Sequence, residues 1–265
     1  VAAAFPQVHL IANQDNRGFA AANNQALRLA RGRYFLLLNP DTLVLDNAIG
    51  KMVAYMAAHP DVGCAGCQVL IDEHTVQQTC FRFPRVWYHL LRATGLPALF
   101  PQSALLNPDR YGGWHRDRER DVDVVSGMFL LVRREAVEQV GLMDEDYFVY
   151  AEEADWCFRF WKHGWRCRFT PSAQIIHRDG GSHSTKQISA RMFVQQQKSL
   201  LIFHRKNRGW WSWGATKALF MLSMLPRYVI FCARSAVTRD SRAAQRARCA
   251  RAALTFHLAG RMATS

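Results

Sequence analysis

A continuous apolar run, Tyr34–Leu38 (YFLLL), constrains the fold most, because it stops abruptly at the polar turn Asn39-Pro40-Asp41-Thr42. A strand that is apolar at every position is typical of a sheet covered on both faces. The run lies between helical patterns at 19–30 and 47–59, and this alternation predicts an α/β domain with a mostly parallel sheet flanked by helices. Further strand patterns lie at 8–12, 62–65, 69–71, 122–133, 166–170 and 173–177, and further helix patterns at 153–163 and 188–207.

The length of 265 residues accommodates one large domain with an appendage. We expect the α/β domain to occupy residues 1–207 and a basic, apolar helical tail to occupy residues 208–265. The net charge is +13, and all of this excess lies in residues 190–265, where Asp240 is the only acidic residue. A basic segment of this kind indicates an anionic partner such as a phospholipid, a nucleic acid or an acidic glycolipid.

The tail combines an apolar stretch with a basic one. The apolar stretch, 218–233, is interrupted by Pro226 and Arg227 and is short for a membrane span of about 20 residues. Because tryptophans favour the membrane interface and basic helices bind anionic lipids, we expect the tail to lie on an anionic membrane surface. The alternative is an ordinary helical appendage packed on the α/β domain. The tryptophans are Trp210, Trp211 and Trp213, and the arginines that follow are Arg239, Arg242, Arg246, Arg248 and Arg251.

The seven cysteines show no spacing typical of a disulfide framework. Cys64 and Cys67 form a lone CxxC pair, and no second pair or pair of histidines follows to complete a zinc site. We interpret the cysteines as small buried or surface thiols in a reducing compartment. The first residues lack the charged segment and long apolar stretch of a signal peptide, and their pattern resembles the interior of an α/β unit.

Asp41 is the first candidate for chemistry, because it follows a buried strand at the edge where open α/β sheets bind ligands. A carboxylate there can hold Mg²⁺ or Mn²⁺, which prefer oxygen ligands and also bind substrate phosphates. The alternative is that Asn39-Pro40-Asp41 simply forms a turn.

An acidic segment, DEDYFVYAEEADW at 144–156, is the second candidate. Its six acidic residues are interrupted by Tyr147, Phe148 and Tyr150, which indicates that part of the segment is packed. Burial raises the pKa of a carboxyl group and makes the carboxylate a better base near neutral pH. The alternative is that Glu152 and Glu153 are acids favoured at a helix N-terminus.

Two weaker candidates complete the set. His177 ends an apolar strand before a Gly-Gly pair, where a neutral imidazole can be a further metal ligand, and His183 competes with it. The loop at 16–24 contains a glycine and leads into a helix whose N-terminus can face a phosphate, although it is neither GxGxxG nor a P-loop.

In their order along the chain, these motifs resemble family-2 inverting glycosyltransferases, and among them the bacterial rhamnosyltransferase-like enzymes of cell-surface polysaccharide assembly. The resemblance covers about residues 5–205 and implies a GT-A fold, a nucleoside-diphosphate sugar donor such as dTDP-rhamnose, and a divalent cation, Mg²⁺ or Mn²⁺. It also implies a glycan or lipid-linked acceptor and a cytoplasmic enzyme held peripherally at the inner face of the cytoplasmic membrane, without a nucleic-acid partner. The motifs are NRGFAAANN (16–24), NPDT (39–42), VSGMFLLVRREA (125–136), GLMDEDYFVYAEEADW (141–156) and IIHRDGGS (175–182).

The resemblance also implies a role for each matching residue. Asp41 binds the metal and the donor diphosphate, and His177 completes the metal site. Glu153 is the general base, with Asp155 as the alternative. The remaining donor contacts are Arg17, Gly18, Asn24 and Asn39, and the acceptor contacts are Ser126, Gly127 and Trp156.

The chain departs from the family pattern in three ways. The family's opening strand–helix–strand segment, which contacts the nucleotide base, is expected to be missing because the motifs begin after it. Asn39 replaces the first aspartate of the family's DxD, and Glu153 stands where aspartate is commoner. A non-catalytic glycosyltransferase remnant or a carbohydrate-binding or scaffolding protein is therefore the alternative. A nucleic-acid-binding protein is a third class, but the basic tail has no zinc-finger spacing, RNP-like signature or heptad zipper.

Overall fold

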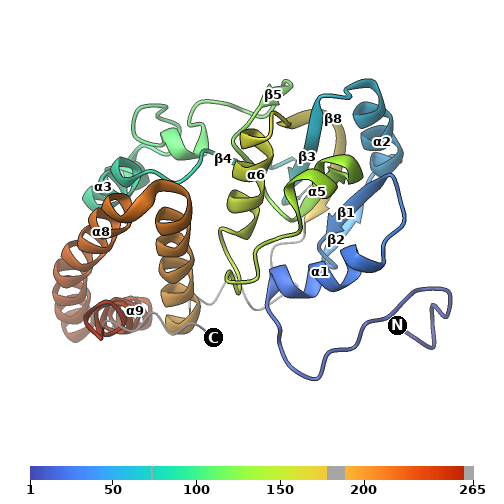
Figure 1. The fold of residues 1–265 in the computed structure, drawn as a ribbon. Helices are drawn as coiled ribbons and strands as arrows, with labels where there is room; N and C mark the ends of the chain where they lie inside the picture. The colour runs from blue at the N-terminus through green and yellow to red at the C-terminus, as the bar shows by residue number, and fades with distance from the viewer. Residues whose placement is uncertain (73, 178–188, 260–265) are drawn as a thin grey trace.

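Six strands form a central sheet among residues 1–72, 74–177 and 189–259, which the computed structural model describes. The spatial order is β1-β7-β3-β8-β2, with β5 paired to β8 (Figure 1). The strands of this sheet are β1 (Tyr34–Leu38), β2 (Thr42–Val44), β3 (Val62–Leu70), β5 (Arg120–Asp121), β7 (Phe129–Arg133) and β8 (Arg166–His177), and a separate ladder joins β4 (Cys80–Phe81) to β6 (Val124–Val125). The helices are α1 (Phe19–Leu29), α2 (Ala48–Ala58), α3 (Val86–Thr94), α4 (Leu96–Leu99), α5 (Arg134–Val140), α6 (Glu152–Lys162), α8 (Ala190–Thr238), α9 (Ser241–Leu258) and the 3-10 turn η1 (Pro108–Arg110).

The sheet is mixed in strand direction. β7 runs antiparallel to both of its neighbours, β1 and β3, whereas β3 and β8 pair in parallel. β1, β3 and β8 therefore point the same way, and β2 runs opposite to β8. The α/β fold is confirmed, but the sheet is not mostly parallel as the sequence suggested. β7 is buried at every position, and such a strand has the same apolar pattern in either direction.

Successive residues of the sheet alternate between two apolar cores. Leu130 and Val132 of β7 pack in one core, together with side chains from α1, α5 and α6. Phe129 and Leu131 pack in the other core, which α2 covers through residues such as Met52. Helices thus cover both faces of the sheet, which explains why its central strands are apolar at nearly every position.

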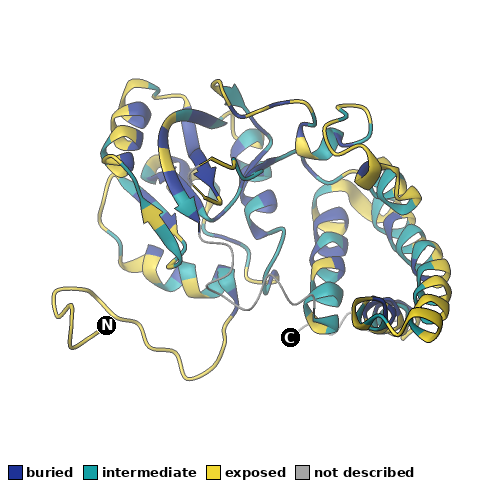
Figure 2. Ribbon diagram, turned by 180° about the vertical axis from the view of Figure 1, so that it is seen from behind, coloured by how far each residue is buried: buried dark blue, intermediate teal, exposed yellow. Residues whose placement is uncertain are grey.

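The predicted strand at 8–12 is wrong. These residues form no regular secondary structure, and residues 1–17 are exposed along their whole length (Figure 2). An isolated apolar run becomes a strand only when a neighbour supplies hydrogen bonds to its backbone, and no described strand pairs with this one.

The C-terminal part consists of α8 and α9. Gly209, with φ of 85° and ψ of 175°, interrupts the helical geometry of α8 and divides it into two arms. The first arm packs on the α/β core through Ile202 and Phe203. α9 packs against α8 in a small core that includes Met224 and Ala253. In Figure 1, the two arms and α9 form an open frame beside the sheet.

Candidate active site

The turn after β1 and the end of β8 bring three predicted site residues together. β2 pairs with β8 so that Thr42 lies opposite His177. Asp41 Oδ1 lies 3.2 Å from His177 Nε2, and Asn39 Nδ2 lies 3.3 Å from the same nitrogen. The Thr42 hydroxyl closes the turn by donating to the Asn39 carbonyl at 2.7 Å. The turn therefore holds two polar side chains against a buried imidazole.

Asp41 and His177 fit a divalent cation. Adjacent ligands of an octahedral ion, each about 2.1 Å from the metal, stand about 3 Å apart, close to the 3.2 Å between Asp41 Oδ1 and His177 Nε2. Carboxylate oxygen and imidazole nitrogen are both ligands of such ions. The Asp41 side chain is 22% exposed, so a substrate phosphate can approach the same position. His177 Nδ1 is buried without a hydrogen-bond partner among the described residues.

Glu153 lies in the first turn of α6 and is held there by Gly127, whose N–H donates to Glu153 Oε1 at 3.0 Å. A Cβ at position 127 would lie 2.8 Å from Glu153 Oε1 and 2.8 Å from Phe19 Cζ, so only glycine fits where these elements meet. The adjacent Met128 carbonyl accepts a hydrogen bond from the Asn39 N–H at 3.1 Å. Residues 127 and 128 thus connect Glu153 to the turn that carries the candidate cation ligands.

The chain enters α6 through a strained turn. Tyr150 and Ala151 both have left-handed backbone conformations, with φ of 71° and 66°. Such a conformation costs a non-glycine residue about 1–3 kcal/mol and persists where the surrounding structure enforces it, often at functional sites. Both residues line the same cavity as Glu153, so the strain sits beside the candidate base.

The two carboxyl groups of the acidic pair have different environments. Glu152 is 1% exposed, and burial together with the charge of Glu153 raises its pKa to about 9. Burial also raises the pKa of Glu153, although the Gly127 N–H opposes this by stabilising the carboxylate. Only Glu153 of the pair is part-exposed and lines a cavity. It is therefore the carboxyl group of the two that a ligand can meet.

A cavity of about 520 Å³ lies between the α/β domain and the C-terminal helices. Ser126 and Glu153 line it from the α/β domain, and Tyr88 lines it from α3. Both arms of α8 contribute, through residues such as Phe193 and Phe220. Its volume falls within the range of small-molecule sites, about 300–1,000 Å³. Ser126 and Glu153, which were both predicted on the acceptor side, thus line one cavity that is large enough for a ligand.

Two predicted substrate contacts are wrong. Trp156 is 0% exposed, and its indole N–H donates to the Gly141 carbonyl at 2.9 Å. Asn24 is also 0% exposed, and its side chain exchanges hydrogen bonds with the backbone of Met143. Neither side chain has surface left for a substrate. Trp156 stabilises the core, and Asn24 fastens α1 to the acidic segment.

Asp155, the alternative base, is engaged in a structural network. It is 3% exposed and accepts hydrogen bonds from Arg159 Nε and Asn207 Nδ2, both at 2.8 Å. The Tyr147 hydroxyl lies 3.5 Å from its Oδ1. Because these partners occupy both oxygens, the geometry favours Glu153 over Asp155 as a base.

Arg17 and Gly18 lie where α1 begins. Gly18 has a positive φ of 81°, and a Cβ there would lie 2.3 Å from the Phe148 carbonyl oxygen. The Phe19 N–H donates to that same oxygen at 2.7 Å. Gly18 thus permits the close approach of α1 to the acidic segment, whereas Arg17 is exposed. Their contacts with the donor stay a prediction.

The remaining acids of the segment bind basic side chains. Lys206 of α8 pairs with Asp144 and Asp146, each at 2.5 Å. Glu145 pairs with Arg28 of α1 at 2.9 Å. The acidic segment therefore ties α1 and α8 to the core, and among its six acids only Glu153 lines the cavity described above.

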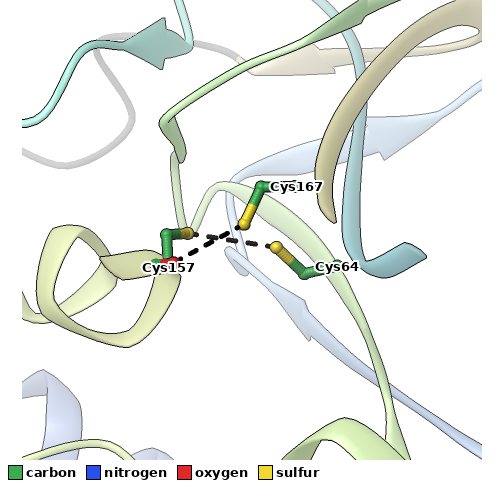
Figure 3. Close-up of side chains that lie close together, drawn as sticks. All are labelled: Cys64, Cys157 and Cys167. Atoms are coloured by element: carbon green, nitrogen blue, oxygen red, sulfur yellow. Dashed lines mark hydrogen bonds between the residues drawn. The ribbon is translucent and has the colours of Figure 1, made fainter. Parts of the chain in front are cut away.

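Three buried thiols, Cys64, Cys157 and Cys167, meet in the core between β3, α6 and β8 (Figure 3). Their sulfur atoms lie within 4.8 Å of one another. A structural zinc ion requires four ligands, and the described residues supply only these three. Burial raises the pKa of Cys167, which keeps its thiol neutral. None of the seven cysteines is in a disulfide and six are buried, which agrees with the interpretation as small buried or surface thiols.

The sequence did not reveal the basic residues of the cavity. Arg82, Arg92, Arg110 and Arg227 all line it. These arginines belong to four separate segments of the sequence. They come together only because α3 packs on α8, and no local sequence pattern predicts such a cluster. The positive charge of the tail was the one indirect sign, because Arg227 belongs to it.

The fold is of the GT-A type found in glycosyltransferases. The mannosyltransferase PcManGT from Pyrobaculum calidifontis, solved with GDP-Man and Mn²⁺, superposes with a TM-score of 0.50 at 16% identity, covering 96% of this chain and 71% of that protein. GalNAc-T7, solved with UDP, GalNAc and Mn²⁺, gives a TM-score of 0.53 at 15% identity, covering 85% of this chain and 41% of that protein.

Sequence comparison specifies the family. Residues 1–141 match the model of glycosyl transferase family 2, and residues 109–259 match that of glycosyl transferase family group 2. The chain therefore belongs to glycosyltransferase family 2. The N-acetylglucosaminyl-diphospho-decaprenol L-rhamnosyltransferase of Mycobacterium tuberculosis is 28% identical over 219 residues, covering 78% of this chain and 70% of that protein. The O-antigen biosynthesis protein RfbC of Myxococcus xanthus is 29% identical over 171 residues, covering 64% of this chain and 13% of that protein.

Proposed function

We propose that this chain transfers a sugar, with inversion, from a nucleoside-diphosphate sugar to a lipid-linked glycan acceptor in cell-surface polysaccharide assembly. The carrying observation is one arrangement: the Asp41–His177 pair fits a cation, and residues 127–128 connect that side to Glu153, which faces a ligand-sized cavity. The similarity to an L-rhamnosyltransferase makes dTDP-rhamnose the first donor to test.

In this mechanism, Asp41 and His177 would hold the divalent cation, and Asn39 lies next to the imidazole. The cation, when bound, neutralises charge on the departing nucleoside diphosphate. The acceptor oxygen bonds to the anomeric carbon on the face opposite the leaving group, so the configuration inverts. Glu153 takes the proton of that hydroxyl group, and the Gly127 N–H fixes the orientation of its carboxylate.

The exposed surface of α8 supports membrane association. Trp211 is 93% exposed, Leu222 71% and Val229 58%. α8 includes the one segment of the described residues that is long and apolar enough to cross a membrane, and only 11% of that segment is buried. We propose that this apolar surface and the arginines of α9 hold the protein peripherally at the inner face of the cytoplasmic membrane, where a lipid-linked acceptor resides.

Calorimetric titration with dTDP and UDP, with and without Mn²⁺, tests the donor site. We expect metal-dependent binding, with the stronger ligand identifying the nucleotide. Asp41→Ala should weaken binding in Mn²⁺ by about 10- to 100-fold, because losing even a side chain that only supports a metal ligand costs about this much. Asp117→Ala changes an exposed aspartate outside the site and is the matched control. Equal affinities for the wild type and Asp41→Ala would remove Asp41 from the donor site.

A further inference from the structure

The cavity that contains Glu153 also has an excess of positive charge. Arg92 from α3, Arg110 from η1 and Arg227 from the second arm of α8 contribute to its wall. Arg227 Nη2 donates to the Arg92 carbonyl at 2.7 Å, which fixes α8 against α3 at this point. The charged residues lining the cavity are Arg82, Arg92, Arg110, Arg227, Asp109 and Glu153.

Protein carboxylates balance only part of this charge. Arg92 forms an ion pair with Asp109. Arg110 and Arg227 have no carboxylate within ion-pair distance among the described residues. Burial lowers the pKa of Arg227. Desolvation and the charge of Arg92 lower the pKa of Arg110 and the charge of Asp109 raises it, although the Arg110 residue as a whole is exposed. The Arg227 guanidinium thus has no carboxylate partner, and that of Arg110 is compensated only by Asp109, which already pairs with Arg92, so an anion in this space would be favourable.

Apolar side chains share the cavity with these arginines. Phe193 and Leu200 come from the first arm of α8, and Phe220 and Met224 come from the second. A hydrocarbon group can therefore contact α8 while an anionic group of the same molecule contacts the guanidinium groups. Guanidinium groups match phosphate oxygens in geometry, because they can donate two parallel hydrogen bonds.

We propose that Arg92, Arg110 and Arg227 bind the phosphate or diphosphate group of the acceptor, and that α8 contacts its hydrocarbon chain. This proposal rests on the proposed transfer reaction and names the chemical class of its acceptor: an amphiphile with a phosphate between its sugar and its lipid. The arginines act as positioning residues, since they hold the acceptor so that a sugar hydroxyl group meets Glu153.

Metal-free titration of the full chain with farnesyl diphosphate, in EDTA, tests this site without the cation-dependent donor site. We expect farnesyl diphosphate to bind, inorganic pyrophosphate to bind more weakly, and farnesol not to bind. Arg110→Gln and Arg227→Gln should each raise the Kd for farnesyl diphosphate about 10-fold, which corresponds to about 1.4 kcal/mol. Arg31→Gln removes an exposed arginine of the α/β domain outside the cavity and should leave the Kd unchanged.

Three results would overturn the proposal. They are absence of farnesyl diphosphate binding, equal weakening by Arg31→Gln, and unchanged binding in both cavity variants. Phosphatidylglycerol vesicles form a further arm: if Arg227→Gln lowers vesicle binding while farnesyl diphosphate does not bind, the arginines serve membrane headgroups instead. Arg110→Gln should fold normally, because the Arg110 guanidinium makes no hydrogen bond to the described residues. Thermal unfolding checks that both variants are folded. A failed donor titration leaves these metal-free results unaffected.

Discussion

Replacing Glu153 by glutamine removes a base and almost nothing else. The amide oxygen of glutamine can still accept the Gly127 N–H, which lies 3.0 Å from Glu153 Oε1, so the first turn of α6 keeps its anchor. General base catalysis contributes about 100- to 10,000-fold to a rate. We therefore expect kcat to fall by this factor, about 2.7–5.5 kcal/mol of transition-state stabilisation, while nucleotide affinity changes less than about two-fold.

The pH profile provides a second signature of the same base. Burial raises the pKa of Glu153, and a protonated carboxyl group cannot accept a proton. The wild-type rate should therefore fall with decreasing pH at a value above the ordinary 4.5 of glutamate. The assay is initial-rate transfer from dTDP-rhamnose to a lipid-linked acceptor between pH 5 and 9. The residual rate of Glu153→Gln should lack this acidic limb.

Glu152→Gln is the matched control. The pKa of Glu152 is raised to about 9, so its side chain is already neutral at pH 7, and glutamine imitates it in charge and shape. Activity within a few-fold of wild type is expected. If Glu153→Gln retained more than a tenth of the wild-type kcat, or if Glu152→Gln lost as much, Glu153 would not be the base.

Two further perturbations test stability and membrane binding. Folded Glu152 binds a proton more tightly than unfolded Glu152, so the wild-type free energy of unfolding should fall as pH rises from about 4.5 towards 9. In urea unfolding at pH 8, Glu152→Gln should be more stable than wild type by a few kcal/mol, at about 1.4 kcal/mol per pKa unit. At pH 5 the two proteins should be equally stable. A gap that stayed constant with pH would refute this assignment. The double variant Trp211→Ser/Leu222→Ser should reduce sedimentation with phosphatidylglycerol vesicles about 10-fold, while its retention on heparin is unchanged. The control is Leu105→Ser, which changes a residue of the α/β domain that is 78% exposed. If Leu105→Ser reduced vesicle sedimentation as much as the double variant, α8 would be excluded as the membrane contact.

The sequence predicted the residues whose position follows from strand ends. Asp41 and His177 both lie where an apolar run stops, and strands that end at one edge of a sheet bring such residues together. Aromatic neighbours indicated that part of the acidic segment is packed, and the resemblance to the family selected Glu153 within it, whose role as the base stays a prediction. Asn24 and Trp156 were misplaced for a common reason. A motif identifies the element that carries a residue, whereas the direction of a side chain depends on the packing of that element, which buries both side chains.

The cavity and the strand directions depend on contacts that no local pattern encodes. β7 lies between β1 and β3 although its sequence position follows both, and its fully apolar pattern suits either direction. Arg92 and Arg227 are 135 positions apart and meet only because α8 bends at Gly209 and its second arm reaches α3. Gly209 is only a weak sequence signal for this bend, because helices also accommodate glycine without bending.

The proposed domain boundary between residues 207 and 208 leaves all the candidate catalytic groups in the first part, but residues of both parts line the cavity. Asn207, the last residue of the first part, donates a hydrogen bond to Asp155, which lies two residues after Glu153 on the same helix. Beyond the division, Phe220 and Arg227 complete the wall of the cavity that Glu153 faces. The donor side, at Asp41, draws on the α/β domain, whereas the acceptor side needs both parts. A tail that binds the membrane would therefore also shape the space in which a lipid-linked acceptor meets the base, so membrane binding and acceptor recognition would be coupled through α8.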